Sequence, residues 1–470
     1  MREFGLFIDG QVMPGTRTSP VVNPATEITV ALAARATPVE LDLAVESAQR
    51  AFATWSQLMV AQRQKAVGRI AQIMEENVDQ LGELLMLEQG KPLSAAKNEV
   101  LRAAEFFRYA ALRQVEDRHI HAGGGRDSII QRRPLGVVAC IIPWNFPIAL
   151  MALKVPLALI AGNTLVVKPA GSTPLSTLRF AELVGDILPA GVLNVLSDEN
   201  DLGPLISAHP GIRKISFTGS TATGRRVMAT AASTLKRVTL ELGGNDPAIV
   251  LDDADPKLVA ARIFAFAFVN SGQMCIAIKR VYVPEALHDR LCEELVLLAE
   301  QAVVGAGTEE GVQIGPLQNR AQFDRILELL QDCNSRGTIL TGGNRVGNKG
   351  FFVRPAIVCD VADGDRIVDE EQFGPILPIV KYTNLDKVVD TLNRGEMGLG
   401  ASIWTQDSER AEELADRLEF GTIWINDHMA LSPALPFSGA RQSGIGAELG
   451  DDGLHEFCQL RVVNRALPRT

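Results

Sequence analysis

One cysteine, Cys275, stands in a stretch that could support nucleophilic chemistry. It lies in Ser271–Ala277, between a Gly-Gln turn and small apolar residues, after an apolar helical run over residues 263–269. A cysteine thiolate is a strong nucleophile. A free cysteine is also among the most buried residue types, so the local sequence by itself favours a packing role. The choice between these two roles depends on residues elsewhere in the chain.

Two polar residues could assist such a nucleophile. Asn145 lies in Pro143–Pro147, where an apolar strand meets a helix. Its side chain could cap that helix, or its amide could donate a hydrogen bond to a developing oxyanion. Glu241 directly follows an apolar strand, and a glutamate beside a core usually has a partner or a function. Taken singly, each of these motifs is a modest signal.

Other residues lie where an anionic cofactor could bind. Lys168 ends a predicted strand, and ligands collect at the carboxyl ends of strands in open α/β sheets, although a solvated loop lysine is an equally good interpretation. Gly219 and Ser220 open a helix whose N–H groups would suit a pyrophosphate, but their spacing differs from the usual dinucleotide fingerprint. Glu371 precedes a Gly-Pro turn, where a surface acidic pair is the commoner case.

These residues lie at the ends of short apolar runs that alternate with helical runs from residue 128 onward. Such alternation indicates an α/β fold with a mainly parallel sheet and helices on both faces. The chain is expected to begin with helices, because Thr37–Glu40 has the composition of a capping box. Later helical runs are expected at 61–87 and 94–117. The first α/β series has strands at 137–142, 164–167, 192–196, 214–217 and 237–240 and helices at 148–161, 174–188, 202–208 and 222–232; the second has strands at 248–251, 281–283, 376–380, 401–404 and 422–425.

Composition argues against several classes of protein. The 46 basic and 56 acidic residues give a net charge of −10, which disfavours a nucleic-acid binder. The most apolar window, 137–162, is interrupted by prolines and by Lys154, so we expect no membrane span. The N-terminus lacks the apolar core of a secretory signal. Scattered cysteines without paired spacing indicate reduced thiols in the cytoplasm, and the histidines form no metal-ligand pair, so no metal is expected.

In their order and setting, these motifs resemble those of the aldehyde dehydrogenase superfamily over nearly the whole chain. The resemblance implies a Rossmann-like cofactor domain, a second α/β catalytic domain and a small β oligomerisation flap. The matching motifs are P-W-N-F-P at 143–147, K-P at 168–169, F-T-G-S at 217–220, E-L-G-G at 241–244, G-Q-x-C at 272–275, E-x-F-G-P at 371–375 and a closing motif over 436–446. The implied boundaries are 1–117 and 134–243 for the NAD(P)-binding domain, 244–445 for the catalytic domain, and 118–133 with 446–470 for oligomerisation.

The resemblance implies oxidation of an aldehyde to the carboxylic acid with NAD or NADP, through a thiohemiacetal and a thioester on Cys275. Asn145 and the backbone N–H of Cys275 would stabilise the oxyanion, and Glu241 would be the general base for hydrolysis. Lys154 matches a lysine near the catalytic centre of the family, with its role left open. Cofactor contacts are expected from Trp144, Lys168, Gly171, Gly219, Ser220, Glu371 and Phe373.

Two departures from the family pattern bear on the cofactor and the substrate. Gly171 stands where many NAD-preferring relatives have glutamate, so we expect less repulsion of a 2′-phosphate and use of NADP as well as NAD. Leu153 stands where the succinic-semialdehyde branch tends to have arginine, which favours an apolar aliphatic or aromatic aldehyde. The expected pocket residues are Phe146, Leu150, Leu153, Met274, Ile276 and Phe437, with His428, Met429 and Leu431 in an entrance loop.

Members of this family assemble as homodimers or homotetramers. The flap at 119–133 and a terminal strand at 459–464 would form that contact, since an unpaired strand edge seeks a partner. The alternative functions are a CoA-acylating or semialdehyde dehydrogenase and a catalytically silent scaffold. Glu241 argues against CoA acylation, because relatives that pass the acyl group to CoA generally lack this base. Cys275 and Glu241 together argue against a silent scaffold.

Overall fold

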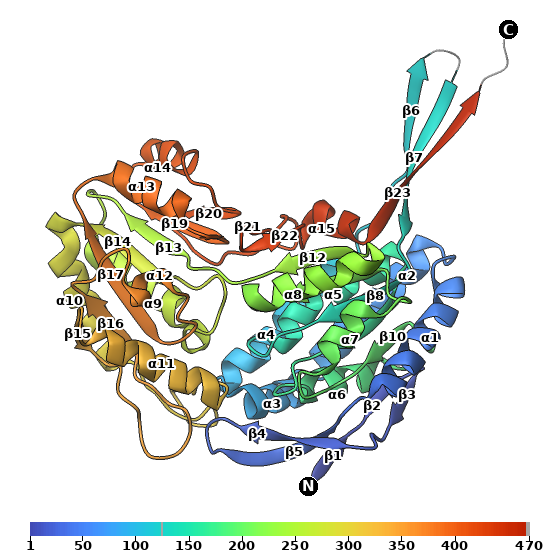
Figure 1. Cartoon of the computed structure of the whole chain (residues 1–470), viewed down its shortest axis with the longest axis horizontal. Coiled ribbons are helices and arrows are strands. Elements are labelled where there is room, and N and C mark those ends of the chain that lie inside the picture. The colour runs from blue at the N-terminus through green and yellow to red at the C-terminus, as the bar shows by residue number, and fades with distance from the viewer. Residues whose placement is uncertain (124–125, 467–470) are drawn as a thin grey trace.

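The computed structural model describes residues 1–123 and 126–466, with side chains described outside 121–123. Two α/β lobes lie side by side, and an arm of strands extends away from the first lobe (Figure 1). The chain up to about residue 241 builds most of the first lobe, residues 247–425 build the second, and the C-terminal segment returns along the first. The α/β class predicted from the sequence is confirmed.

The first lobe is built on a sheet with the strand order β22-β12-β11-β8-β9-β10-β2-β3, in which β8 to β12 run parallel. The carboxyl ends of the parallel strands therefore meet at one edge, where ligands bind in open α/β sheets. The five predicted strands of this series appear as β8 (Val137–Ile141), β9 (Thr164–Lys168), β10 (Leu193–Val195), β11 (Lys214–Thr218) and β12 (Arg237–Glu241).

Side chains alternate across this sheet and pack against helices on both faces. Val138 and Cys140 pack into one core, whereas Val137 and Ala139 pack into the other. The helices of the first core are α2 (Val60–Glu76), α3 (Val78–Gln89), α4 (Leu93–Ala110), α5 (Pro147–Ala161) and α6 (Leu175–Val184); those of the second are α1 (Pro38–Trp55), α7 (Leu202–Ala208) and α8 (Thr221–Ala231). The predicted capping box of Thr37 and Glu40 begins α1.

The prediction that the chain begins with helices is wrong. Strands β1 (Arg2–Phe4), β2 (Leu6–Ile8), β3 (Gln11–Met13), β4 (Thr18–Asn23) and β5 (Ile28–Ala34) precede α1. Three-residue strands are too short to show alternation, and they form because other strand edges supply their hydrogen bonds, as β10 does for β2. The helix expected over 61–87 is also divided, because α2 and α3 meet at Asn77.

The second lobe has a sheet with the order β15-β16-β17-β14-β13-β19-β20. The predicted strands appear as β13 (Pro247–Val250), β14 (Arg280–Pro284), β17 (Ile376–Tyr382), β19 (Gly400–Trp404) and β20 (Thr422–Ile425); β15 (Thr338–Thr341) and β16 (Ala356–Cys359) complete the sheet. Its helices are α9 (Pro256–Phe268), α10 (Glu285–Gln301), α11 (Arg320–Cys333), α12 (Arg366–Asp369), α13 (Leu385–Arg394) and α14 (Ser408–Ala415).

The C-terminal segment connects the lobes. β21 (Ala440–Arg441) pairs with β18 (Met397–Gly398), and β22 (Gly444–Ile445) pairs antiparallel with β12. The expected catalytic domain of 244–445 therefore ends inside the first sheet, because β22 satisfies the open edge of β12. The short helix α15 (Gly450–Glu456) then packs beside α5.

The arm is an antiparallel sheet of β6 (Arg118–Gly123), β7 (Arg126–Pro134) and β23 (Cys458–Ala466), in the order β23-β7-β6. It lies where the flap and the terminal strand were expected and projects beyond both lobes (Figure 1). Leu460, Val462 and Val463 on β23 are largely exposed.

The described residues contain neither a membrane-spanning helix nor a cluster of metal-binding side chains. None of their helices is long and apolar enough to cross a membrane. None of their His, Cys, Asp and Glu side chains form a group of three or more that could hold a metal ion.

Candidate active site

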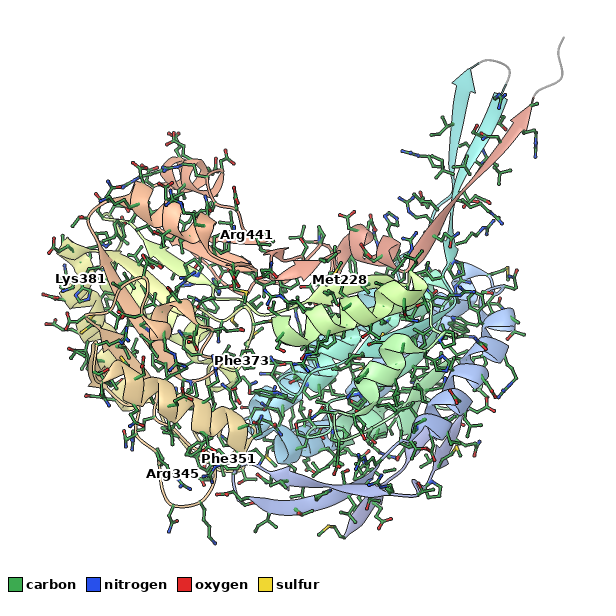
Figure 2. The ribbon with its side chains drawn as sticks, viewed as in Figure 1. Met228, Arg345, Phe351, Phe373, Lys381 and Arg441 are labelled. Atoms are coloured by element: carbon green, nitrogen blue, oxygen red, sulfur yellow. The ribbon has the colours of Figure 1, made fainter. Side chains whose placement is uncertain are left out.

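A cleft of about 320 Å³ opens where the two lobes meet. Seven of the residues predicted from motifs line it, although they come from four separate parts of the chain. They are Trp144, Asn145, Gly219, Ser220, Cys275, Glu371 and Phe373. In Figure 2 Phe373 lies on the side of the second lobe that faces the first.

Cys275 is presented to the cleft by an unusual backbone. After α9 ends at Phe268, Asn270 has φ 49° and Ser271 has φ 58°, both left-handed, and Gly272 follows with φ 74°. Left-handed non-glycine residues cost about 1–3 kcal/mol each and persist only where surrounding contacts hold them. The Ser271 hydroxyl donates to the Gly315 carbonyl at 2.8 Å, which is one such contact. A Cβ on Gly272 would lie 2.2 Å from the Gly374 carbonyl oxygen, so only glycine fits there.

The cysteines differ in access. All six lie in the described part of the chain and all are free thiols, but Cys275 alone among them is partly exposed. Burial raises the pKa of the Cys275 thiol to about 12, and the nearby carboxylates of Glu371, Asp246 and Glu241 contribute to this rise. The ammonium of Lys279 opposes them. A thiolate at this position therefore depends on the charges around it.

Asn145 is fixed against the cysteine loop. Its side-chain Nδ2 donates to the Gln273 carbonyl at 3.0 Å, two residues before Cys275. Its backbone carbonyl accepts from the Asn270 side chain at 3.0 Å and from the Lys91 ammonium at 3.0 Å. A side-chain amide carries two N–H donors, so one remains after the bond to Gln273.

The alternative role for Asn145, capping the following helix, is wrong. The N-terminus of α5 is capped by Glu99, whose Oε1 accepts from the backbone N–H groups of Ile148 at 3.0 Å and Ala149 at 3.1 Å. Glu99 also pairs with Lys91, and both side chains are buried. Sequence reasoning missed this pair, since a Lys and a Glu eight residues apart on one segment give no signal of a buried contact.

Glu241 ends β12 beside the cleft, with 4% of its surface exposed. Neither carboxylate oxygen has a hydrogen-bond partner in the part of the chain that the structure describes. Burial raises the pKa of Glu241 well above its ordinary value, and the charge of Glu448 adds to this, while Lys154 opposes it. A buried carboxylate without a donor is costly, which indicates a functional rather than a packing role.

Lys154 is not among the residues that line the cleft, but its charge acts on Glu241. Its ammonium forms an ion pair with Glu448, and both side chains are buried. The Ser216 hydroxyl donates to the same carboxylate at 3.3 Å. Glu448 was missed, because it is a lone glutamate near the C-terminus, 294 positions from its partner.

A second cleft of about 430 Å³ shares Trp144, Gly219 and Ser220 with the first. Lys168, Asn200 and Arg226 also line it. The Lys168 ammonium pairs with Asp198 at 2.6 Å, and a Cβ on Gly171 would lie 2.3 Å from the Asp198 carbonyl oxygen. Gly171 is thus required by the close approach of the neighbouring loop. The sequence did offer a signal for Asp198, since it follows β10, the strand beside β9.

The side chain of Ser220 caps α8 by accepting from the Thr223 backbone N–H at 3.3 Å. The N-terminus of α8 therefore opens into the shared wall of the two clefts. Its unpaired N–H groups and its dipole favour an anion.

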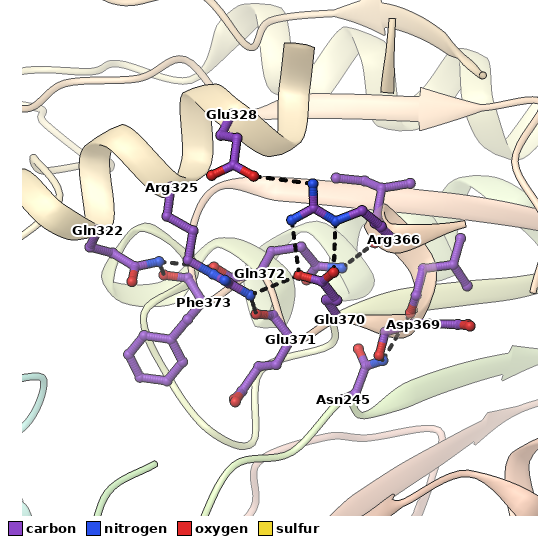
Figure 3. A network of polar contacts seen from close by, with 12 residues as sticks. Asn245, Gln322, Arg325, Glu328, Arg366, Asp369, Glu370, Glu371, Gln372 and Phe373 are labelled. Carbon is purple, nitrogen blue, oxygen red and sulfur yellow. Dashed lines mark hydrogen bonds and ion pairs between the residues drawn. The ribbon is translucent and has the colours of Figure 1, made fainter. Parts of the chain in front are cut away.

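Glu371 and Phe373 are held by α11 (Figure 3). Gln322 donates to the carbonyls of Gln372 and Phe373, both at 2.9 Å, and Arg325 donates to the Glu371 carbonyl at 3.3 Å. The Glu371 carboxylate points away from this network (Figure 3). Its Oε1 accepts from the Gly244 N–H at 3.3 Å, and burial raises the pKa of Glu371 to about 7.

Phe373 completes an aromatic corner of the cleft. Its ring meets the Trp144 ring edge to face, with centroids 5.4 Å apart. The two residues come from opposite lobes, so this contact helps to fix the width of the cleft.

The residues expected in the substrate pocket divide into two groups. Leu150 and Met274 are partly exposed and, like Cys275, Met429 and Leu431, pack against the core of the first lobe. The ring of the partly exposed Phe146 lies 3.7 Å from the Lys91 ammonium. Leu153, Ile276 and Phe437 are buried in the same core.

The expectation that His428 forms part of an entrance is wrong. The imidazole is buried, with Nε2 2.8 Å from the Ile276 carbonyl oxygen. Burial lowers its pKa to about 3, so the ring is neutral and Nε2–H donates to that carbonyl. His428 therefore supports the cysteine loop from behind.

Comparisons with known proteins agree with this arrangement. The model of the aldehyde dehydrogenase family matches residues 12–463. A putative aldehyde dehydrogenase DhaS of Bacillus subtilis is 37% identical over 97% of this chain and 94% of its own. A mitochondrial aldehyde dehydrogenase of Leishmania tarentolae is 39% identical over 98% of this chain and 94% of its own.

Solved structures show the same fold. The NAD+ complex of an aldehyde dehydrogenase from Bacillus cereus superimposes with a TM-score of 0.97 at 35% identity, covering 99% of this chain and 97% of that one. Both lobes are included in the match. The chain therefore belongs to the aldehyde dehydrogenase family.

Proposed function

We propose that this enzyme oxidises an aldehyde to its carboxylic acid by covalent catalysis at Cys275, with Asn145 as oxyanion donor and Glu241 as general base. The observation that carries the proposal is the buried Glu241 carboxylate, which has no hydrogen-bond donor among the described residues and acts on Cys275, a cysteine that follows a left-handed loop. General bases are tuned by burial in this way.

The reaction begins when the Cys275 thiolate attacks the carbonyl carbon and forms a thiohemiacetal. The free N–H of the Asn145 amide and the backbone N–H of Cys275 receive the oxyanion, and such donors are worth about 3–4 kcal/mol each. NAD(P)+, when bound in the second cleft, would supply the hydride acceptor for this oxidation. Loss of hydride from the thiohemiacetal carbon then leaves a thioester on Cys275. Glu241 then removes a proton from water, the hydroxide attacks the thioester carbon, and the acid leaves as Sγ departs.

The residues present fit an anionic dinucleotide. The second cleft is lined by two cations, Lys168 and Arg226, and by no carboxylate among its described lining residues. The N-terminus of α8 would hold the pyrophosphate and Glu371 a ribose hydroxyl. Arg226 and Gly171 support use of NADP+ as well as NAD+. Neither residue is a carboxylate, and the described lining of this cleft has no carboxylate that would repel a 2′-phosphate.

Hydrolysis is favoured over transfer to CoA by the same glutamate. Glu241 provides a base for water, which a CoA-acylating enzyme does not need. Leu150, Met274, Met429 and Leu431 are partly exposed apolar residues that pack against the same core as Cys275, which supports an aliphatic or aromatic aldehyde. Residue 153 is leucine rather than arginine, so it cannot pair with the carboxylate of an anionic semialdehyde.

Assembly as a homodimer or homotetramer is supported by the arm. β23 lies at the edge of its sheet with Leu460, Val462 and Val463 exposed, and an apolar open edge of this kind pairs with another chain. A monomer by light scattering would contradict this assignment. The free thiols fit a reducing compartment such as the cytoplasm.

The test is an assay of reduced nicotinamide with hexanal, benzaldehyde and succinic semialdehyde, each with NAD+ and with NADP+. We expect activity with the apolar aldehydes, its loss in Cys275→Ser, and weaker activity with succinic semialdehyde. Equal rates on hexanal and succinic semialdehyde would refute the apolar pocket. Activity in Cys275→Ser would refute the covalent mechanism.

A further inference from the structure

A buried ion pair lies against the loop that carries Asn145. Lys91 stands between α3 and α4, Glu99 belongs to α4, and both side chains are buried. The Lys91 ammonium donates to Oε2 of Glu99. It also donates to the backbone carbonyl of Asn145 at 3.0 Å and lies 3.7 Å from the centre of the Phe146 ring. One ammonium therefore contacts two consecutive residues of the loop between β8 and α5.

The other carboxylate oxygen of Glu99 holds the far end of the same loop. Oε1 accepts from the backbone N–H groups of Ile148 at 3.0 Å and Ala149 at 3.1 Å, in the first turn of α5. Glu99 thus joins the N-terminus of α5 to Lys91, and Lys91 joins Glu99 to Asn145. These contacts form a closed ring that holds the loop at both ends. Hydrogen bonds in which a partner is charged are stronger than neutral ones, so the ring is a firm support.

The side chain of Asn145 depends on this backbone for its position. Its Nδ2 donates to the Gln273 carbonyl at 3.0 Å, and its Oδ1 accepts no hydrogen bond from the described residues. The direction of the second N–H of Nδ2 is therefore set by where the backbone places the side chain. The backbone carbonyl of Asn145 accepts from the Lys91 ammonium and from the Asn270 side chain, both at 3.0 Å. Asn270 belongs to the cysteine loop, so Lys91 is the donor that holds Asn145 from within the first lobe.

We infer that Lys91 and Glu99 are positioning residues for the oxyanion donor, because they hold the backbone of Asn145 where its free side-chain N–H meets the oxyanion. This rests on the proposed role of Asn145. Neither Lys91 nor Glu99 is among the described residues that line the cleft, so both act through Asn145 and not on the substrate. An oxyanion donor has to lie about 2.7–3.1 Å from the developing charge, and a misplacement of about 1 Å can cost about 100-fold in rate.

Another lysine pair of the first lobe offers a matched control. The buried Lys214 on β11 pairs with Glu456 at 3.1 Å, and its ammonium lies 5.4 Å from the centre of the Phe457 ring. Its second acceptor, the Thr239 hydroxyl at 2.5 Å, lies outside the described lining of the cleft. The two pairs share a buried lysine, a carboxylate partner and an aromatic contact, and they differ in what the ammonium holds.

The test compares two reactions of the Cys275 thiol that need neither cofactor nor aldehyde. In acylation by p-nitrophenyl acetate, Sγ attacks the ester carbon, a tetrahedral oxyanion forms, the acetyl group passes to Sγ and p-nitrophenolate leaves. Alkylation by iodoacetamide is a direct displacement of iodide and forms no oxyanion. The ratio of the two rate constants therefore measures stabilisation of the oxyanion separately from the reactivity of the thiol.

The variants separate the lysine donor from the buried charge. Lys91→Met keeps the length of the side chain and removes its donor, but alone it would leave the Glu99 carboxylate buried without a partner. Lys91→Met/Glu99→Gln removes both charges, and the glutamine oxygen can still accept from the N–H groups of α5. Glu99→Gln alone keeps the Lys91 donor to Asn145. Asn145→Ala is the reference for complete loss of the oxyanion donor.

We expect Lys91→Met/Glu99→Gln to lower the ratio of acylation to alkylation by at least about tenfold, with alkylation itself within about twofold of the wild type. Asn145→Ala should lower the ratio by about 10²–10³-fold. In the Asn145→Ala background the double substitution should lower the ratio by less than about twofold more, because both changes act through one amide. Glu99→Gln and the control Lys214→Met/Glu456→Gln should keep the ratio within about threefold of the wild type.

An unchanged ratio in Lys91→Met/Glu99→Gln would overturn the inference, as would an equal fall in the control variant. A fall in alkylation as large as that in acylation would overturn it too, since the pair would then support the cysteine and not the oxyanion donor. Full additivity with Asn145→Ala would have the same meaning. If Asn145→Ala itself leaves the ratio unchanged, the proposed role of Asn145 is refuted along with the inference. A fall in Asn145→Ala with none in Lys91→Met/Glu99→Gln refutes the inference alone.

Discussion

Glu241→Gln separates the chemical role of Glu241 from any structural one. Glutamine has the same size as glutamate, and neither oxygen of Glu241 receives a hydrogen bond in the described part of the chain. The substitution therefore breaks no contact. It removes a negative charge from a side chain that is 4% exposed.

The effect on stability follows from the direction of the pKa shift. Burial and the charge of Glu448 raise the pKa of Glu241 in the folded protein. Because the folded protein favours the neutral carboxyl, Glu241 contributes its full share to the free energy of unfolding below its pKa in the unfolded chain, which is about 4.3. This contribution is lost as the pH rises towards the higher pKa of the folded protein. An ionised carboxylate buried without a donor costs more than a neutral amide in the same place. At pH 8 the melting temperature of Glu241→Gln should therefore equal or exceed that of the wild type, and the difference should shrink towards pH 5.

The effect on activity should be large and confined to hydrolysis. Loss of a general base typically lowers the rate of its step by about 10²–10⁴-fold. Attack by Cys275 and the redox step precede hydrolysis, so a stopped-flow trace should still show a burst of reduced nicotinamide near one equivalent per subunit. The whole loss of rate should appear in the slow steady-state phase that follows the burst. A steady-state rate within twofold of the wild type would refute the role of Glu241, and a lowered melting temperature would show that the side chain has a structural partner instead.

Three other substitutions give sharp expectations. Asn145→Ala should lower kcat by about 10²–10³-fold through loss of one oxyanion donor, measured as initial rates, and a loss below about threefold would remove Asn145 from the chemistry. Glu448→Gln leaves the Lys154 ammonium buried without its partner, so urea unfolding should show about 3–5 kcal/mol less stability; no change would mean that another group takes over the pairing. Arg226→Gln should lower kcat/KM for NADP+ by about tenfold and leave NAD+ nearly unchanged, because an exposed arginine binds a 2′-phosphate by charge and hydrogen bonds. Equal losses with both cofactors would place Arg226 elsewhere on the nucleotide.

Much of the fold could be predicted because apolar runs and helical runs alternate regularly after residue 128. The strands from β8 to β14 differ from their predicted ranges by no more than one residue at either end. β2 and β3 could not be predicted, since three residues show no period and their stability comes from pairing with β10 and with each other. β22 has two residues, and it likewise owes its stability to pairing with the edge strand β12.

The site was predictable where a motif lies in the cleft wall and not where a charge is buried behind it. Asn145, Cys275 and Glu371 stand in motifs and line one cleft. Glu448 and Lys279 are single charged residues, and only the fold shows that each is buried beside a catalytic element. A charged residue in a sequence reads as a surface residue unless its partner is known. His428 was misplaced for the related reason that a histidine in a polar loop gives no sign of burial.

The central claim is that an acyl group passes through Cys275. The most direct measurement is to mix Glu241→Gln with NAD(P)+ and hexanal and to stop the reaction with acid. The mass of the peptide that carries Cys275 is then measured by mass spectrometry. This peptide should gain one hexanoyl group in place of the thiol proton, and only when both the cofactor and the aldehyde are present. A burst of reduced nicotinamide with an unmodified Cys275 peptide would contradict it.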